Sequence, residues 1–344
     1  MEHTDEVRYS RQVRFAPIGR EGQALIRAAR VLLLGCGGLG AETASLLARA
    51  GVGFLRLVDR DVVDLSNLQR QALFDENDVK EGLPKAAAAA RRIARVNSGV
   101  RVEPVVTDLD SSNILDLMKG IDFVVDGFDN FEGRYLLNDA CVKLNLPWVY
   151  GACVGGGGVA ALLVPGVTPC LRCLQPTPPE AGASPTCDTL GILGPAAHLT
   201  ASLEAGLTLR YLVTGEAPRH AALLSCDIWE GHLQRVDIPY RPEDHPCPCC
   251  VEHRFEFLDA PPPPALLLCG RETVQVHPAV AARPDFAVLT EQLRGMGELV
   301  ANEYLLRLKV PPHELTLFQD GRANVTGTAD TVLARSLVAR YFGR

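Results

Sequence analysis

The sequence predicts an α/β protein, in which a doubly wound, largely parallel sheet is followed by a small C-terminal α+β domain. Three observations support this fold class. Apolar segments alternate with helix-forming segments over roughly the first 150 residues, a glycine-rich turn joins the first apolar segment to a helix, and a proline run sets apart about 80 C-terminal residues. The length of 344 residues has room for two domains.

The elements of the first domain follow from its hydrophobic pattern. An amphipathic helix is expected over about 11–29, and the alanine- and leucine-rich segment that ends at Ala50 predicts another. Predicted strands cover 31–34, 54–58, 100–106, 121–125 and 148–150, and further helices cover 85–96, 135–143 and 191–214. A glycine run, Gly155–Gly158, precedes an apolar strand, and residues 175–187 are expected to form a mobile loop.

The second domain is expected to begin near Pro261–Pro264, because polyproline forms a semi-rigid spacer. The predicted division is into residues 1–257 and 258–344. Predicted strands of the second part cover 272–277, 299–309 and 314–326, and its helices cover 285–295 and 328–342. Asp320-Gly321, between strand-like residues, indicates a hairpin turn.

The composition argues against several classes of protein. Lys and Arg number 34 against 41 Asp and Glu, a net charge of −7, whereas a nucleic-acid binder needs a surplus of basic residues. No apolar run reaches the ~20 residues that span a bilayer, and the polar N-terminus has no hydrophobic signal segment, so the cytoplasm is the expected compartment. Eleven cysteines, an odd number, do not fit a small disulfide scaffold.

Gly35-x-Gly37-x-x-Gly40 stands between the first predicted strand and its helix, as in a Rossmann-like nucleotide site. The glycines allow a tight turn, and the helix N-terminus offers unpaired N–H groups to a phosphate. Asp59 ends the next strand, where a carboxylate can accept hydrogen bonds from ribose hydroxyls. These features alone also fit an NAD-dependent dehydrogenase.

Further polar residues near the same strand ends favour a triphosphate. Residues 61–71 carry acidic, amide and cationic side chains, Lys85 begins a helix, and Asp129 follows the fourth predicted strand. Lys and Arg offset the charge of a triphosphate, and a carboxylate holds Mg²⁺. Singly, these residues fit a solvated arginine, a helix-start lysine and an Asx turn. Their convergence on one sheet edge indicates ATP chemistry instead.

Several segments together resemble the ThiF/MoeB family, the bacterial relatives of ubiquitin-activating enzymes. These segments are Arg8-Tyr-Ser-Arg11-Gln12, GCGGLG at 35–40, LVDRD at 57–61, LSNLQRQ at 65–71, Pro84-Lys85 and DGFDN at 126–130. The resemblance keeps the family's order and spacing over about residues 5–255, and it is closest to ThiF-type proteins with an extra C-terminal domain. Glu81-Gly-Leu-Pro84, before the lysine, departs from the Gly or Val-Gly-Gln that the family often has there.

The resemblance implies an ATP-dependent adenylyltransferase that activates the C-terminal Gly-Gly of a ubiquitin-like sulfur-carrier protein as an acyl-adenylate, as in thiamine or molybdopterin biosynthesis. It also implies a homodimer in which Arg11 reaches the phosphates in the neighbouring subunit's site. Asp129 would hold Mg²⁺, and Arg70 and Lys85 would offset the phosphate charge. The glycine motif and the resemblance together give these candidate ATP contacts: Gly35, Gly37, Gly38, Gly40, Asp59, Asp61, Ser66, Asn67, Leu68, Gln69, Arg70, Lys85, Asp129 and Asn130.

Two cysteine pairs predict a zinc site. Cys170 and Cys173 lie in a Pro/Gly-flanked turn, and Cys247 and Cys250 follow about 75 residues later with the same spacing. Four thiolates so spaced form the closed tetrahedral site of a structural Zn²⁺, which leaves Cys249 without a role as a ligand. A redox pair is the alternative, but neither pair begins a thioredoxin-like helix. The family resemblance implies the same zinc site.

Cys187 is expected to differ chemically from the other cysteines. It ends the predicted mobile loop and precedes an apolar helix, and a thiol near a helix N-terminus has a lowered pKa. The segment Cys-x-Thr-x-Gly-Ile-Leu-Gly-Pro that begins there resembles the place where ThiF-type proteins carry an acyl-accepting cysteine, although MoeB-type relatives do not use it. An inert loop cysteine is the alternative. Core positions are expected for Cys36, Cys141, Cys153, Cys226 and Cys269, and His198 is expected to be a satisfied helix histidine.

Three functions compete with carrier adenylation. They are an NAD-dependent dehydrogenase, a bacterial ubiquitin-activating-type enzyme that forms a thioester on Cys187 for protein tagging, and a non-catalytic scaffold. The SNLQR segment and the two cysteine pairs weigh against the first, and the presence of Arg70, Lys85 and Asp129 weighs against the last. The C-terminal domain, whose one cysteine is Cys269, lacks a rhodanese-like cysteine loop, so a docking or dimer role is expected there and the sulfur donor would be another protein.

Overall fold

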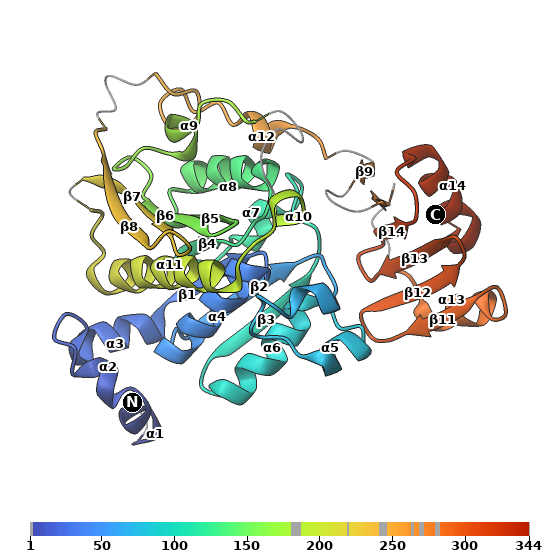
Figure 1. Cartoon of the computed structure of the whole chain (residues 1–344), viewed down its shortest axis with the longest axis horizontal. Helices are drawn as coiled ribbons and strands as arrows, with labels where there is room; N and C mark the ends of the chain where they lie inside the picture. The colour runs from blue at the N-terminus through green and yellow to red at the C-terminus, as the bar shows by residue number, and fades with distance from the viewer. Residues whose placement is uncertain are drawn as a thin grey trace. The chain divides into compact units, whose positions relative to one another are not determined.

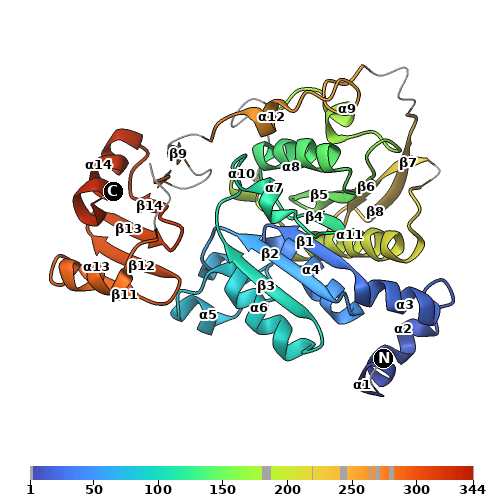
Figure 2. The same ribbon diagram turned by 180° about the vertical axis from the view of Figure 1, so that it is seen from behind.

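The computed structural model describes residues 3–179, 187–218, 220–240, 246–262, 265–267, 272–278 and 283–343. The chain divides into two compact units, Met1–Pro261 and Pro262–Arg344. Figures 1 and 2 show the elements of each unit from opposite sides. The division falls within the proline run at 261–264.

The first unit is built on an eight-stranded sheet with the order β3-β2-β1-β4-β5-β6-β7-β8. Its strands are β1 (Arg30–Leu34), β2 (Phe54–Asp59), β3 (Arg101–Val106), β4 (Phe123–Asp126), β5 (Trp148–Val154), β6 (Gly157–Leu163), β7 (Ala221–Asp227) and β8 (His232–Ile238). The strands from β3 to β5 are parallel, and those from β5 to β8 pair antiparallel. The predicted largely parallel sheet is confirmed, with an antiparallel extension made of β6, β7 and β8. The sequence predicted β6, the apolar strand after the glycine run, but not β7 or β8.

Helices cover both faces of this sheet, with α4, α6 and α11 on one face and α7 and α8 on the other (Figure 1). The helices of the unit are α1 (His3–Arg8), α2 (Ser10–Val13), α3 (Gly19–Ala28), α4 (Gly38–Ala50), α5 (Glu76–Lys80), α6 (Lys85–Val96), α7 (Ile114–Leu117), α8 (Phe131–Leu144), α9 (Leu171–Leu174), α10 (Cys187–Leu190), α11 (Gly194–Thr214) and α12 (Glu256–Asp259), with a 3-10 turn, η1 (Leu65–Asn67). Among the described residues, no helix combines the length and the apolar character needed to cross a bilayer.

The predicted single helix over 11–29 is wrong, because the chain there forms α2 and α3 with a turn between them. Pro17 lies in this turn and has no N–H for a continuous helix, and Gly19 begins α3 with a φ of +57°. The predicted strand over 299–309 is likewise divided. Between its two halves, the Asn302 side chain accepts the backbone N–H groups of Tyr304 and Leu305 and so forms a turn.

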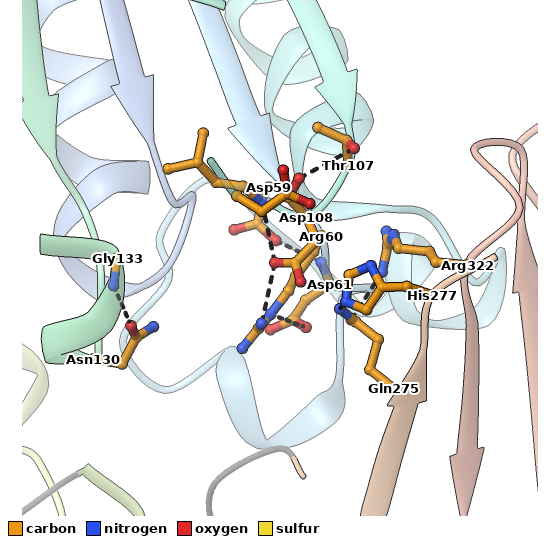
Figure 3. A network of polar contacts seen from close by, with 12 residues as sticks. Asp59, Arg60, Asp61, Thr107, Asp108, Asn130, Gly133, Gln275, His277 and Arg322 are labelled. Carbon is orange, nitrogen blue, oxygen red and sulfur yellow. Dashed lines mark hydrogen bonds and ion pairs between the residues drawn. The ribbon is translucent and has the colours of Figure 1, made fainter. Parts of the chain in front are cut away.

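The second unit is a six-stranded antiparallel sheet with the order β11-β12-β13-β14-β10-β9 and two helices. Its elements are β9 (Ala265–Leu267), β10 (Thr273–Val276), α13 (Phe286–Leu293), β11 (Glu298–Ala301), β12 (Leu305–Val310), β13 (His313–Phe318), β14 (Ala323–Thr326) and α14 (Thr331–Phe342). Leucines and valines on one face of the sheet pack with residues of α13 and α14. The Gln275 side chain forms hydrogen bonds with both His277 and Arg322 (Figure 3).

Helix α11 carries a fully buried glutamate, Glu204, into the core of the first unit. The Thr43 hydroxyl of α4 donates to Glu204 Oε2 at 2.9 Å, and within the described part of the chain Oε1 has no hydrogen-bond partner. A Cβ on Gly151 of β5 would lie 1.7 Å from that oxygen. Burial and the neighbouring Asp126 raise the pKa of Glu204 well above its ordinary value, which favours the protonated form of this side chain in the folded protein.

The contribution of Glu204 to the stability of the protein should therefore fall as the pH rises above about 5. In this window the unfolded chain releases the Glu204 proton and the folded chain keeps it, which costs up to about 1.4 kcal/mol of the free energy of unfolding per pH unit. Glu204→Gln keeps the shape and the neutral state. Urea titrations from pH 5 to 9 should show a flatter pH dependence for this variant, and identical slopes would contradict a protonated Glu204.

Candidate functional site

The glycine turn after β1 packs directly against the end of β4. A Cβ on Gly35 would lie 2.4 Å from the Gly127 carbonyl oxygen, and one on Gly40 would lie 1.8 Å from the Gly35 carbonyl oxygen. Gly35 also has a φ of +92°, which other residues rarely adopt. Gly37 is the N-cap of α4 and Gly38 is its first residue. The turn thus places the N-terminus of a 13-residue helix at the carboxyl edge of the parallel strands.

Asp59, the last residue of β2, ties this turn to the segment that follows β2. One carboxylate oxygen accepts the Cys36 N–H at 2.6 Å, and the other accepts the Asp61 N–H at 2.7 Å. Burial raises the pKa of Asp59, whereas the nearby Lys85 acts in the opposite direction. Asp59 therefore also stabilises the backbone on both sides of the site, a role that its position at a strand end did not predict.

Lys85, the first residue of α6, is a buried cation at this edge. Its Nζ lies 2.9 Å from Asp61 Oδ2, and its side chain is 7% exposed. Burial lowers the pKa of Lys85, but the attraction of Asp61, Asp59 and Asp129 outweighs burial and raises it overall. Beside them, Arg60 pairs with Asp108 at 3.1 Å (Figure 3). Lys85 is thus held in its charged form in an environment with little water.

The segment from Ser66 to Arg70 lies against the glycine turn. Asn67 is buried, and its side chain and that of Asp64 cap η1 reciprocally. The Arg70 guanidinium donates to the Ser66 carbonyl at 3.1 Å, and the Arg70 stem would lie 3.5 Å from a Cβ on Gly38. The Arg70 carbonyl is 3.2 Å from His198 Nε2, which gives this histidine the hydrogen-bond partner expected for it.

Asp129 and Asn130 follow β4 on the same side of the sheet. Asn130 caps α8 by accepting the Gly133 N–H at 2.9 Å (Figure 3), and its amide donates to Asp129 Oδ1 at 3.1 Å. Asp129 is exposed, yet it is near enough to Lys85 to raise the pKa of that residue. Asn130 thus has a capping role, whereas the carboxylate of the adjacent Asp129 remains exposed.

Arg11 and Cys187, which were also expected to be catalytic, lie on other elements than Lys85, Arg70 and Asp129. Arg11 is exposed on α2, and both views place α2 away from α5 and α10 (Figures 1 and 2). Cys187 begins α10, and its thiol lies 3.7 Å from the Cys153 carbonyl oxygen. Backbone hydrogen bonds of Gly155 with Gly191 and Leu193 hold the segment after Cys187 against the end of β5. Residues 180–186 of the predicted loop lie outside the described residues.

The four predicted metal-binding cysteines form one cluster. The Sγ atoms of Cys170, Cys173, Cys247 and Cys250 all lie within 4.8 Å of one another, with separations of 3.6 Å for Cys170–Cys247 and 3.4 Å for Cys173–Cys250. Thiolates bound tetrahedrally to zinc at ~2.3 Å are about 3.8 Å apart, so the cluster fits that metal. It lies near Trp148, the first residue of β5, and thus at the opposite end of the strands from the glycine turn.

Cys249 is buried beside this cluster without belonging to it. Asn138 of α8 donates from its amide to Cys249 Sγ at 3.2 Å and accepts the Leu171 N–H at 2.8 Å, so it connects the two cysteine segments. Of the cysteines expected in the core, Cys36, Cys141 and Cys226 are buried and Cys153 is half-buried. Cys269 lies outside the described residues.

Comparison with known proteins identifies the family of the chain. A model of the ThiF family matches residues 9–249. The chain belongs to the ThiF family. It is 43% identical over 338 residues to the sulfur carrier protein ThiS adenylyltransferase of Bacillus subtilis, covering 98% of this chain and 99% of that relative. It is 41% identical to the SAMP-activating enzyme E1 of Haloferax volcanii, covering 73% of this chain and 91% of that one.

Solved structures show the same fold. The crystal structure of E. coli MccB with ATP is similar with a TM-score of 0.60 and 25% sequence identity, and the match covers 71% of this chain and 74% of MccB. The resemblance to the ThiF/MoeB family and the predicted Rossmann-like fold are confirmed. No role was predicted for Asp126 or Gly194, which were named only as members of longer segments, and Arg134 was not singled out from the sequence. A Cβ on Gly194 would lie 2.8 Å from the Gln69 carbonyl oxygen, a contact that only the folded chain reveals.

Replacing a clustered cysteine should remove the metal and lower stability together. We expect Cys170→Ser to lose nearly all bound zinc and to lower Tm by roughly 10 °C or more, because the metal crosslinks two distant segments. Zinc content by elemental analysis and Tm by calorimetry measure the two effects. Cys249→Ser is the matched control and should keep its zinc; equal zinc loss in both variants, or no zinc in the wild type, would contradict this metal site.

Proposed function

We propose that this chain is an ATP-dependent adenylyltransferase that activates the C-terminal glycine of a ubiquitin-like sulfur-carrier protein. The supporting observation is that Arg70, Lys85 and Asp129 gather at the glycine-turn edge of the sheet in a chain that matches a ThiS adenylyltransferase over nearly its whole length. Fold similarity alone would not specify this chemistry, since one fold hosts many functions.

In this proposal, the carrier's terminal carboxylate attacks the α-phosphorus of ATP. A carboxylate oxygen–phosphorus bond forms, the bond to the β-phosphate oxygen breaks, and pyrophosphate leaves with the electron pair. The step needs no protein nucleophile, so the residues of the site act by positioning and by charge. Lys85 and Arg70 offset the charge of the phosphates, and the N-terminus of α4 offers N–H groups to them.

The proposed ATP contacts are the glycine turn, Asp59 toward the ribose, and the segment from Ser66 to Arg70. Asp129 is proposed to hold Mg²⁺, because it is an exposed carboxylate beside the phosphate site. When bound, Mg²⁺ supplies further neutralisation of phosphate charge. Zinc on the four cysteines is proposed to be structural, since its site is remote from the glycine turn.

Arg11 is proposed to serve the site of a second subunit in a homodimer. Within one chain, Arg11 is exposed and α2 lies apart from α5 and α10 (Figures 1 and 2). A role at the phosphates therefore requires a second copy of the chain. The cytoplasm is the proposed compartment, and the C-terminal unit, proposed to span 258–344, is a docking or dimer element in this account.

Thioester formation on Cys187 for protein tagging is less favoured. The relative that matches almost the whole chain is named for adenylation of a sulfur carrier. Adenylation itself needs no thiol, so Cys187 could act only after the acyl-adenylate has formed. Its half-buried position at the start of α10 is compatible with such a later step.

Asp129→Ala should reduce carrier-dependent ATP–pyrophosphate exchange by about 10²–10³-fold, because a charge partner of the transition state is lost. The exposed position of Asp129 predicts little change in Tm. Glu132→Ala, which removes another exposed carboxylate three residues away, is the control and should retain exchange. Exchange at the wild-type level in Asp129→Ala would overturn the assignment.

Cys187→Ala should keep exchange near the wild-type level and lose a thiol-sensitive covalent adduct with the carrier. Non-reducing gels detect the adduct and exchange assays detect adenylation. Cys153→Ala, at the neighbouring thiol, should preserve both. An adduct at full yield in Cys187→Ala would show that another thiol reacts, and loss of exchange would show that α10 helps to form the adenylation site.

A further inference from the structure

Arg134 is a buried cation on α8 that none of the proposed ATP contacts includes. Its guanidinium makes three hydrogen bonds at once. Nε donates to Asp126 Oδ2 at 3.0 Å, and Nη2 donates to the carbonyl oxygens of Phe128 at 2.7 Å and Gly151 at 2.8 Å. It therefore joins the end of β4, the segment after it and β5.

These bonds restrain the residues on both sides of Asp129. Asp126 Oδ1 also accepts the Phe128 N–H at 2.9 Å, so Phe128 is held through both its N–H and its carbonyl group. On the other side, Asn130 is fixed as the N-cap of α8. The backbone of Gly127 is also held in place, because its N–H donates to the Leu34 carbonyl. It packs so closely on the glycine turn that a Cβ on Gly127 would lie 2.3 Å from the Gly35 carbonyl oxygen.

Only an arginine can make this set of contacts. The guanidinium is a rigid planar fork with donors in several directions, whereas a lysine ammonium is a compact charge on a flexible stem. At position 134 a lysine could pair with Asp126 but could not reach both carbonyl groups in the same geometry. The charge of the buried pair would remain balanced, and the restraint on the Phe128 carbonyl would be lost.

We propose that Arg134 is a positioning residue for adenylation, which fixes the place of the Asp129 carboxylate without touching ATP. The inference rests on the proposed function and deepens it. Because Arg134 acts through Asp129, its loss affects the use of Mg²⁺ and the rate of the chemical step. Lys85, with its partner Asp61, lies on other elements and keeps its contacts.

The test is Arg134→Lys in the full-length, zinc-loaded protein with a ThiS-type carrier. We expect the Mg²⁺ concentration for half-maximal carrier-dependent exchange to rise about tenfold or more and the maximal rate to fall by roughly 10²-fold, as for a catalytic group misplaced by about 1 Å. The Kd of ATP measured without Mg²⁺ should stay within about twofold of the wild-type value, because no proposed phosphate contact changes.

Arg172→Lys is the matched control. Arg172 is also mostly buried in this unit, where it pairs with Glu256 at 3.0 Å and lies beside the rings of Tyr135 and Phe257. Its replacement should leave the Mg²⁺ dependence unchanged, whatever its effect on Tm. If Arg134 were merely structural, Arg134→Lys would behave like this control: whatever activity remained would need the same Mg²⁺ concentration as the wild type. That result overturns the proposal.

Two further outcomes are separable. If the wild-type protein shows no carrier-dependent exchange, the proposed function fails, and Arg134 has no such reaction to serve. If Arg134→Lys does not fold, the paired substitution Arg134→Met with Asp126→Asn replaces it, because it removes both charges of the buried pair together. The amide at position 126 keeps the bond from the Phe128 N–H, and the bonds from Arg134 to the Phe128 and Gly151 carbonyls are lost. The same rise in the Mg²⁺ requirement is then expected, and an unchanged requirement overturns the proposal.

Discussion

The close approach of two backbone turns, one after β1 and one after β4, determines the rest of the site. A side chain on Gly35, Gly40 or Gly127 would place its Cβ within 2.4 Å of a backbone oxygen. Since the turns touch, the residues that follow neighbouring parallel strands converge on one edge, where α/β sheets bind ligands. Asp59, Lys85 and Asp129 share surroundings for this reason, although they are far apart along the chain.

The convergence confines charged groups to a region of low water content, where an unpaired charge is costly. The structure pairs them instead: Lys85 with Asp61, Arg60 with Asp108, and Arg134 with Asp126. Glu204, which has no cationic partner within hydrogen-bond distance among the described residues, has its pKa raised, which favours its neutral form. Groups held in fixed geometry in this way need little reorganisation when a charged substrate binds, which is the physical basis of electrostatic preorganisation.

The sequence predicted those parts of the fold that local patterns encode. In the parallel half, short apolar segments that form strands alternate with longer segments that form helices. The glycine turn, Lys85 and the cysteine pairs were found from the spacing of their residues along the chain. The break between α2 and α3 was not predicted, because the helical spacing of apolar residues continues across Pro17. The edge strand β8, most of whose residues are exposed on both faces, has no apolar alternation to detect.

The contacts of Arg134 and Glu204 were beyond prediction for a different reason. Each joins segments that are distant in sequence, Arg134 with Gly151 and Glu204 with Thr43, and nothing in the local pattern marks a buried charge on a helix. The placement of Asp129 was predictable from the end of β4, but the restraint on it was not. Local sequence thus located the candidate site, and tertiary packing supplied its rigidity.

The step that defines the proposed function is the attack of the carrier's carboxylate on the α-phosphorus of ATP. A carrier whose terminal carboxylate is labelled with ¹⁸O tests it most directly, when the enzyme, Mg²⁺-ATP and an added thiol nucleophile are present and the products are read by mass spectrometry. Attack at the α-phosphorus predicts that the label appears in AMP, because the bridging oxygen leaves with it when the thiol attacks the acyl carbon. Label in pyrophosphate or inorganic phosphate, or none in any nucleotide product, would contradict the account.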